Sequence, residues 1–372
     1  MQHFNKASYR FDARLSDSQT DNLLRACRET SAYPVIMLIE LSKRGLLSQA
    51  LDLTGCGRAL RASRVWEGVL VLNYHRIGDS RHSMLDRNLW SASQDDFDYQ
   101  VGHVAKNFDV IGLDDLEQAL RDRHGRFVMF TFDDGYRDNY LAGYQVLRAH
   151  KVPATFFLTT GFLDSPRVPW WDEIAWMVRS SRLMALDVNR WTSTPVPFDE
   201  PHREQAIRRL LNVYKGLPGE WTGDYLEFLA QALQSGRCPQ SVSENLWMTW
   251  DMVREMRKGG MTFGGHTVTH PILANLSSQA QDWEIAECKR RLVEELGNPI
   301  FAFSFPVGGR SSYNAFTRTS LTQHGFRLAF TYSGAYCRPG HQDLHGISRT
   351  AIETDVCQTQ FRAILTLPQL FA

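Results

Sequence analysis

Short apolar segments alternate with helical patterns along most of the chain, and this alternation limits the possible folds more than any other feature. The clearest strands are 68–74 and 127–132, which are almost continuously apolar. Such runs are typical of strands buried on both faces, as in a parallel sheet covered by helices. Roughly six or more of these strands favour a barrel or partial barrel over a small open sheet. In such a fold, functional groups lie where strands end and loops begin.

The predicted elements follow one another in a regular order. Strands are expected at 68–74, 109–111, 127–132, 154–159, 261–263, 300–305 and 327–331. Helices are expected at 94–106, 113–120, 140–150, 204–214, 249–258 and 277–296, with a further helix between the last two strands.

Two segments fall outside this rhythm. Residues 1–65 carry leucines at roughly helical spacing and predict a separate helical extension, more suited to packing or a partner surface than to catalysis. The remaining residues, 66–372, are expected to form the barrel domain. An insertion of helices and loops, rich in Trp and Pro, is predicted at about 164–248. Within it, the charge-rich stretch 203–209 predicts a solvated helix face.

The overall composition excludes several classes of protein. The 41 Lys and Arg residues balance 41 Asp and Glu residues, which argues against nucleic-acid binding and against a strong attraction to anionic membranes. The six cysteines are scattered without a CxxC pair, which indicates reduced thiols and no disulfide framework. No apolar run approaches the ~18 residues of a transmembrane helix, and the N-terminus lacks a secretory pattern. We therefore predict no transmembrane segment and a cytoplasmic location.

Two adjacent carboxylates follow the strand 127–132. Asp133 and Asp134 precede Gly135, and neighbouring side chains at a strand end point in different directions. One carboxylate can therefore bind a metal while the other acts as a base beside it. The alternative is a helix N-cap, for which Asp is common, although a pair before Gly fits that role less well.

Two histidines four residues apart follow the strand 261–263. His266 and His270 face the same way if the chain forms a helix or a tight turn, with Cβ atoms ~5–6 Å apart. In an extended strand the same spacing would span ~13 Å, too far for one ion. This pair alone is as compatible with a structural role as with metal binding. Together with an aspartate, it supplies a two-His, one-carboxylate set with an open position for water.

A third polar cluster, Asn73-Tyr74-His75-Arg76, follows the first strand. A histidine at a strand end is more often structural than catalytic. If the three strands share a parallel sheet, however, His75 lies at the same edge as the other two clusters. It could then donate a proton to the leaving group of a metal-assisted hydrolysis.

In this order, Thr131–Gly135 (TFDDG), His266–His270 (HTVTH) and Phe305–Gly308 (FPVG) resemble the polysaccharide deacetylase family, carbohydrate esterase family four. The resemblance covers roughly 66–160 and 249–350. It implies a distorted (β/α) barrel of about seven strands, here with the N-terminal extension and the insertion. It also implies that Asp133 is the general base and that Asp134, His266 and His270 hold a divalent metal, with zinc as the default. The backbone amide of Tyr136 would then help to stabilise the oxyanion.

The chain departs from the commonest family pattern in two places. No late Leu-x-His segment carries the acid. The segment Tyr74-His75-Arg76 instead resembles the poly-N-acetylglucosamine deacetylase branch, which assigns the acid to His75 and leaves His341 and His345 as weaker candidates. The usual Arg-x-Pro-Tyr segment is also replaced, so that either Arg310 or Arg349 could orient Asp133.

Trp170 and Trp171 open the insertion just after a strand end. Flat indole rings suit stacking on sugars, so both are candidate substrate-binding residues, although a Trp pair is more often part of a core.

The main functional hypothesis is a metal-dependent hydrolase that removes N-acetyl groups from amino sugars of a bacterial glycan or glycan precursor. A metal-activated water would attack the amide, with an Asp base and a His acid. One alternative is a noncatalytic carbohydrate-binding or assembly protein on the same barrel, suggested by the missing late motifs. Another is an amide hydrolase for a non-sugar or formyl substrate.

Overall fold

The computed structural model describes residues 65–297 and 299–372, together with positions 45, 47–49, 51, 54, 57 and 60. These residues belong to one compact unit. The predicted extension 1–65 therefore lies almost entirely outside the described residues. None of the described helices is long and apolar enough to cross a membrane.

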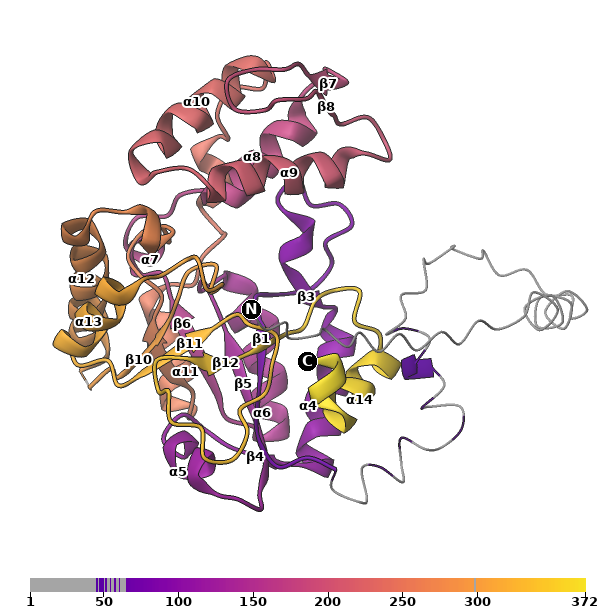
Figure 1. Ribbon diagram of the computed structural model, residues 1–372, viewed down its shortest axis with the longest axis vertical. Coiled ribbons are helices and arrows are strands. Elements are labelled where there is room, and N and C mark those ends of the chain that lie inside the picture. Colours follow the sequence, from indigo (N-terminus) through magenta and orange to yellow (C-terminus); the bar gives the residue numbers. More distant parts are fainter. Residues whose placement is uncertain are drawn as a thin grey trace, which may run out of the picture. The chain divides into compact units, whose positions relative to one another are not determined.

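One parallel sheet forms the centre of the domain (Figure 1). Its longest pair is β1 (Gly68–Tyr74) and β5 (Arg126–Phe132), in register from Gly68 opposite Arg126 to Tyr74 opposite Phe132. Every residue of β1 is buried, as the continuous apolar run predicts. The sheet continues from β5 through β6 (Ala154–Leu158), β9 (Thr262–Gly265), β10 (Ala302–Ser304) and β11 (Leu328–Thr331), while β4 (Asp109–Val110) pairs separately with β5.

A single segment near the C-terminus joins the two edges of this sheet. The strand β12 (Ile347–Ser348) pairs with β11, and β13 (Thr350–Ala351) pairs with β1. Only Arg349 separates these two short strands. If they are taken as one broken strand, seven strands form the barrel: β1, β5, β6, β9, β10, β11 and β12–β13. The predicted distorted barrel is confirmed.

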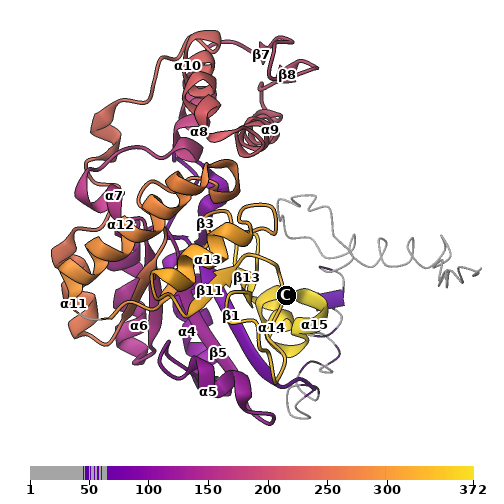
Figure 2. The same cartoon turned by 60° about the vertical axis from the view of Figure 1, so that its left-hand side comes forward.

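Helices cover the outside of the barrel, and short polar caps fix where they begin. The Ser93 hydroxyl accepts from the Asp96 N–H at the start of α4 (Gln94–Asn107), and Ser277 caps α12 (Ser278–Leu296) in the same way. The remaining helices of this layer are α5 (Leu116–Arg121), the π-helical turn η2 (Asn139–Tyr144) with α6 (Gln145–His150), α7 (Thr160–Asp164), α11 (Trp250–Lys258), α13 (Ala315–Gln323), α14 (Gln358–Thr366) and α15 (Pro368–Phe371). Figure 2 shows α14 and α15 beside β1 and β13.

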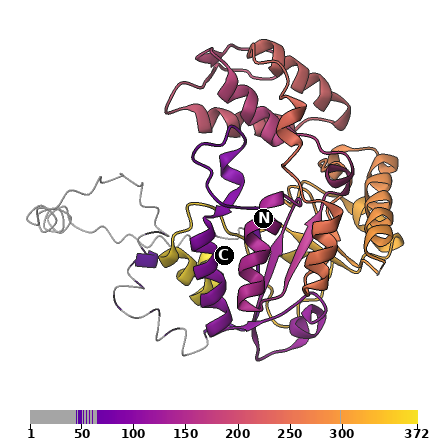
Figure 3. The same cartoon turned by 180° about the vertical axis from the view of Figure 1, so that it is seen from behind.

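The segment between α7 and α11 has its own hydrophobic core. Its elements are α8 (Trp170–Ser180), β7 (Ala185–Leu186), β8 (Val196–Pro197), α9 (Arg203–Lys215), η3 (Gly219–Trp221), α10 (Thr222–Ala232) and η4 (Gln240–Ser243). Apolar side chains of α8, α9 and α10, including Ile174, Ile207 and Leu229, are fully buried against one another. Figures 1 and 3 show this insertion at one end of the barrel. Residues of both the barrel and the insertion line one cavity.

Candidate metal and catalytic site

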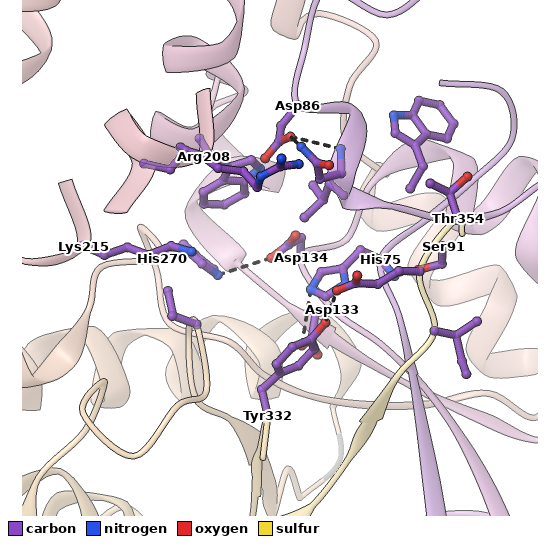
Figure 4. A pocket seen from close by; sticks show the side chains of 18 of the residues that line it. His75, Asp86, Ser91, Asp133, Asp134, Arg208, Lys215, His270, Tyr332 and Thr354 are labelled. Carbon is purple, nitrogen blue, oxygen red and sulfur yellow. Dashed lines mark hydrogen bonds and ion pairs between the residues drawn. The ribbon is translucent and has the colours of Figure 1, made fainter. Parts of the chain in front are cut away.

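Three strand ends bring their polar residues to the same edge of the barrel. His75 follows β1, Asp133 and Asp134 follow β5, and His266 and His270 follow β9. The strands are parallel, so their carboxyl ends lie on one side. All five residues line one cavity of about 550 Å³ (Figure 4). This volume is within the usual range for small-molecule sites.

The two adjacent aspartates point to different partners, as predicted. Asp134 has a φ of 74°, in the left-handed region, and Gly135 follows with a φ of 92°. A non-glycine residue held there costs on the order of 1–3 kcal/mol of strain, which is found mainly at functional sites. This turn sends Asp133 towards Arg349 and Asp134 towards His266 and His270.

Asp134, His266 and His270 form a compact set of possible metal ligands, called the triad below. One ligand atom from each lies within 4.8 Å of the others. Asp134 Oδ1 is 3.5 Å from His266 Nε2 and 3.4 Å from His270 Nε2. Two atoms bound tetrahedrally to one ion, each ~2.1 Å from it, would be separated by ~3.4 Å. The spacing therefore suits ligands sharing an ion.

The protonation and bonding of the triad also fit a metal site. His266 Nδ1 lies 2.7 Å from the Ser304 carbonyl oxygen, which fixes the proton there and leaves Nε2 free to bind an ion. Burial lowers the pKa of His270 to about 3, so its ring is neutral at pH 7. Within residues 65–297 and 299–372, the buried Asp134 Oδ1 has no hydrogen-bond partner. A buried carboxylate oxygen without a partner is costly unless it binds a cation.

The histidine loop is a tight turn and not a helix. Thr267 and His270 have φ values of 67° and 57°, and the His266 and His270 ring centroids are 4.8 Å apart. Glu284 of α12 holds this loop by accepting from the backbone N–H groups of Val268 and Thr269 at 2.7 and 2.9 Å. The turn brings the histidines together without helical hydrogen bonds.

Asp133 is held by a buried arginine. Arg349 Nη1 and Nη2 each donate to a separate oxygen of Asp133 at 2.8 Å, and Asn73 Nδ2 donates at 3.3 Å. Burial alone would raise the pKa of Asp133, but Arg349 and His266 outweigh it and keep this pKa below its usual value. The carboxylate is therefore ionised and fixed in orientation.

The structure distinguishes the two arginines considered for this role. Arg310 is exposed, does not line the cavity and forms no hydrogen bond with Asp133. Its expected contact with Asp133 is wrong, because the loop after β10 turns its side chain to solvent. Arg349, between β12 and β13, is 1% exposed and forms that contact.

His75 faces Asp133 across the cavity. Its Nε2 is 4.0 Å from Asp133 Oδ2, and its side chain is 20% exposed. The backbone of His75 is fixed on both sides, because its N–H donates to Ser91 Oγ and its carbonyl accepts from Asn139 Nδ2. By contrast, His341 and His345 do not line this cavity. Of these three described histidines, His75 is the one that lies beside Asp133.

The sequence around this site matches a known protein family. A family model described as polysaccharide deacetylase matches residues 121–185 and 219–329. The chain belongs to the polysaccharide deacetylase family. Membership places it among hydrolases that act on carbon–nitrogen bonds other than peptide bonds, and implies a carbohydrate substrate. The matched ranges omit 186–218, which contain β8 and α9.

Solved structures agree with this family. The Streptococcus pyogenes deacetylase PplD in complex with acetate is similar, with 18% identity, a TM-score of 0.52, and coverage of 82% of this chain and 98% of that chain. IcaB from Ammonifex degensii has 20% identity and a TM-score of 0.50, over 82% of this chain and 97% of that chain. At these identities the similarity establishes the fold. No match was found among curated proteins.

In this member of the family, Tyr136 joins the barrel to the insertion. Its hydroxyl donates to Asp172 Oδ2 at 2.7 Å and accepts from Trp171 Nε1 at 2.8 Å. No hydrogen bond in the described part of the chain uses its backbone N–H. Asp172 is fully buried at the start of α8, and burial raises its pKa to about 7. Nothing local in the sequence indicates that Asp172 meets Tyr136.

Trp170 and Trp171 line the cavity but are mostly covered by protein, at 8% and 5% exposure. The Trp170 ring stacks on Tyr214 with centroids 4.2 Å apart, and Trp171 meets the His270 ring at 4.4 Å, nearly edge-on. Both residues therefore help to build the wall beside the triad. Their contact with a sugar stays a prediction.

Proposed function

We propose that this chain is a metal-dependent hydrolase that removes N-acetyl groups from amino sugars of a bacterial glycan or glycan precursor. The observation that carries the proposal is the triad, with the unpartnered Asp134 Oδ1 at ligand spacing from two imidazoles. Beside it stands a carboxylate, Asp133, fixed by Arg349. The similar deacetylase PplD was solved with acetate, which is the product expected from N-acetyl removal.

Asp134, His266 and His270 would hold the ion, and zinc is the default for two imidazoles with one carboxylate. A divalent ion held there would polarise the amide carbonyl of the substrate and lower the pKa of the attacking water. The protein leaves the cavity side of the triad open for both groups.

Asp133 would accept the proton that water loses as it attacks the carbonyl carbon. Arg349 and Asn73 hold its two oxygens, so the base does not have to be oriented during the reaction. The backbone N–H of Tyr136 would donate to the oxygen that gains negative charge.

His75 would give a proton to the sugar nitrogen as its bond to the acetyl carbon breaks. The products are acetate and a free amine. His75 Nε2 lies 4.0 Å from Asp133 Oδ2, so acid and base would both be within reach of an amide bound in this cavity.

The test is acetate release from N-acetylglucosamine oligomers by the full chain, before and after chelation and after return of single metals. Activity should disappear with the chelator and return with zinc or another divalent ion. Asp134→Ala should lose both bound metal and activity, whereas Asp133→Asn should keep the metal and lose roughly 10²–10⁴-fold in rate.

Asp355→Asn is the matched control, because it removes another carboxylate of the same cavity and leaves the triad intact. It should bind the ion as the wild type does. Full activity of the chelated protein, or of Asp134→Ala, would contradict the proposal. If the chain released another acyl group from sugars in preference to acetate, the proposed substrate would be wrong.

A further inference from the structure

The insertion brings two cationic side chains to the same cavity as the triad. Arg208 and Lys215 lie on α9 and line the cavity together with Asp134 and His270. In Figure 4 they approach from one side, whereas His75 and Thr354 stand on the other. Arg208 is exposed, as predicted for the stretch 203–209, and its side chain also lines this cavity.

Neither cation has a protein partner. Within the described ranges, no hydrogen bond or ion pair engages the Arg208 guanidinium or the Lys215 ammonium. Their neighbours on α9 differ: Arg203 pairs with Glu200 at 2.6 Å, and Arg209 donates to the carbonyl oxygens of Thr194 and Pro195. Among the described residues of α9, Arg208 and Lys215 are the cations whose side chains have no such partner.

The acidic residues of the cavity do not neutralise them. Asp86 accepts from the backbone and the side chain of Asn88, and burial raises its pKa. Glu353 accepts from the Tyr332 hydroxyl at 3.2 Å and, with Asp355, flanks Thr354 on the far side. None of these carboxylates lies within 4.0 Å of a nitrogen of Arg208 or Lys215 among the described ion pairs.

Both side chains are open to solvent at the mouth of the cavity. The walls around Lys215 are nevertheless close enough for desolvation to lower its pKa, an effect that Asp86 partly offsets. A ligand anion that displaces the remaining water would compensate both cations for the solvation they lose. An Arg fork suits phosphate and carboxylate equally, and Lys adds a point charge.

We infer that the substrate carries an anionic group, a phosphate or a carboxylate, which Arg208 and Lys215 bind while the acetamido group lies at the triad. This inference rests on the proposed function and specifies its substrate class. The cations stand on α9, within the part that the family match omits. They would select the substrate, whereas Asp133, His75 and the triad would carry out the hydrolysis.

The test compares acetate release from three kinds of substrate. The first is a neutral N-acetylglucosamine oligomer. The second carries phosphate, as N-acetylglucosamine 1-phosphate or UDP-N-acetylglucosamine. The third is an oligosaccharide in which N-acetylglucosamine alternates with a glucuronic acid. A higher kcat/KM for the second or third substrate identifies the anion as phosphate or carboxylate.

The variants are Arg208→Gln, Lys215→Gln and the double variant. Each single change should lower the ratio of kcat/KM for the preferred anionic substrate to that for the neutral oligomer by about tenfold, mainly through KM. Arg208→Lys should restore part of it. Added salt should reduce the preference of the wild type, because the cations are open to solvent.

Arg182→Gln is the control, since Arg182 is an exposed cation of the insertion that does not line the cavity. It should leave the ratio unchanged. A wild type that prefers the neutral oligomer, with the same ratio in all variants, would overturn the inference while the proposed function stands. Absence of acetate release from all three substrates would overturn both.

Discussion

The two walls of the cavity are built in opposite ways. On the barrel side, Asp133, Asp134 and Arg349 are at most 2% exposed, and hydrogen bonds from Arg349 fix the Asp133 carboxylate beside the triad. On the insertion side, Arg208 and Lys215 are exposed, and no side chain in the described part of the chain forms a hydrogen bond or ion pair with them. Other protein groups hold the polar side chains of the barrel wall, whereas no hydrogen bond or ion pair within the described residues holds the two cations of the insertion wall.

The barrel wall is therefore suited to catalysis, and the insertion wall is suited to substrate recognition. A base and metal ligands must be aligned before the reaction, because a displacement of ~1 Å can cost about 10²-fold in rate. Exposed cations on long side chains lose ~1–2 kcal/mol each in rotamer entropy when they are ordered, so they suit recognition better than catalysis. The following variants test this division, beginning with the largest expected effect.

Arg349→Met should damage both the barrel side of the cavity and the fold. It leaves Asp133 buried without its counter-ion, which costs about 3–5 kcal/mol in the free energy of unfolding. The misaligned base should lower kcat by roughly 10²-fold. Denaturant titration and acetate release measure the two effects. Arg310→Met, which removes an exposed arginine, should change neither; equal losses in both variants would refute the assignment of Arg349.

His75→Gln should lower kcat by about 10²-fold with little change in stability, because its side chain forms no hydrogen bond in the described structure. The loss should nearly vanish with an acetate ester of an acidic phenol, whose leaving group needs no proton. His341→Gln is the matched control, since His341 does not line the cavity. A loss that is independent of the leaving group would exclude His75 as the acid.

Glu284→Gln should weaken metal binding about tenfold, because the charged acceptor for two N–H groups of the histidine loop is lost. Activity should return when excess metal is added. The measurement is a metal titration followed by acetate release. Unchanged metal affinity would show that the loop holds its shape without Glu284.

Asp172→Asn tests the junction between the two walls and should have the smallest effect on acetate release. The folded protein raises the pKa of Asp172 to about 7, so it binds more protons than the unfolded chain between about pH 4 and pH 7. The contribution of this group to stability is therefore lost as the pH rises, by at most about 1.4 kcal/mol per pH unit. Chemical denaturation from pH 4.5 to 8 should show a flatter profile for the variant. An identical profile would contradict the raised pKa.

The sequence predicted the barrel and its catalytic edge well because the signals are local. Each buried strand is an apolar run, and Asp133–Asp134 and His266–His270 follow strands directly. Parallel strands then bring these groups to one edge without further information. The histidine turn was also among the two geometries that the spacing allowed.

The features of the site that could not be predicted from the sequence depend on contacts between residues far apart in the chain. Arg349 meets Asp133 across 216 residues of chain, so no local pattern separates it from Arg310. The same holds for Asp172 and Tyr136. On α9, periodicity places Arg208 on a polar face. Only the tertiary fold shows that this face looks into a cavity and not into bulk solvent.

The position of Arg349 ties activity to the completion of the fold. The residue lies between the two short strands that meet opposite edges of the sheet. A nascent chain that has not yet delivered this segment already contains all three metal ligands, but its base is unaligned. Activity would therefore require that the segment carrying Arg349 is paired with the sheet.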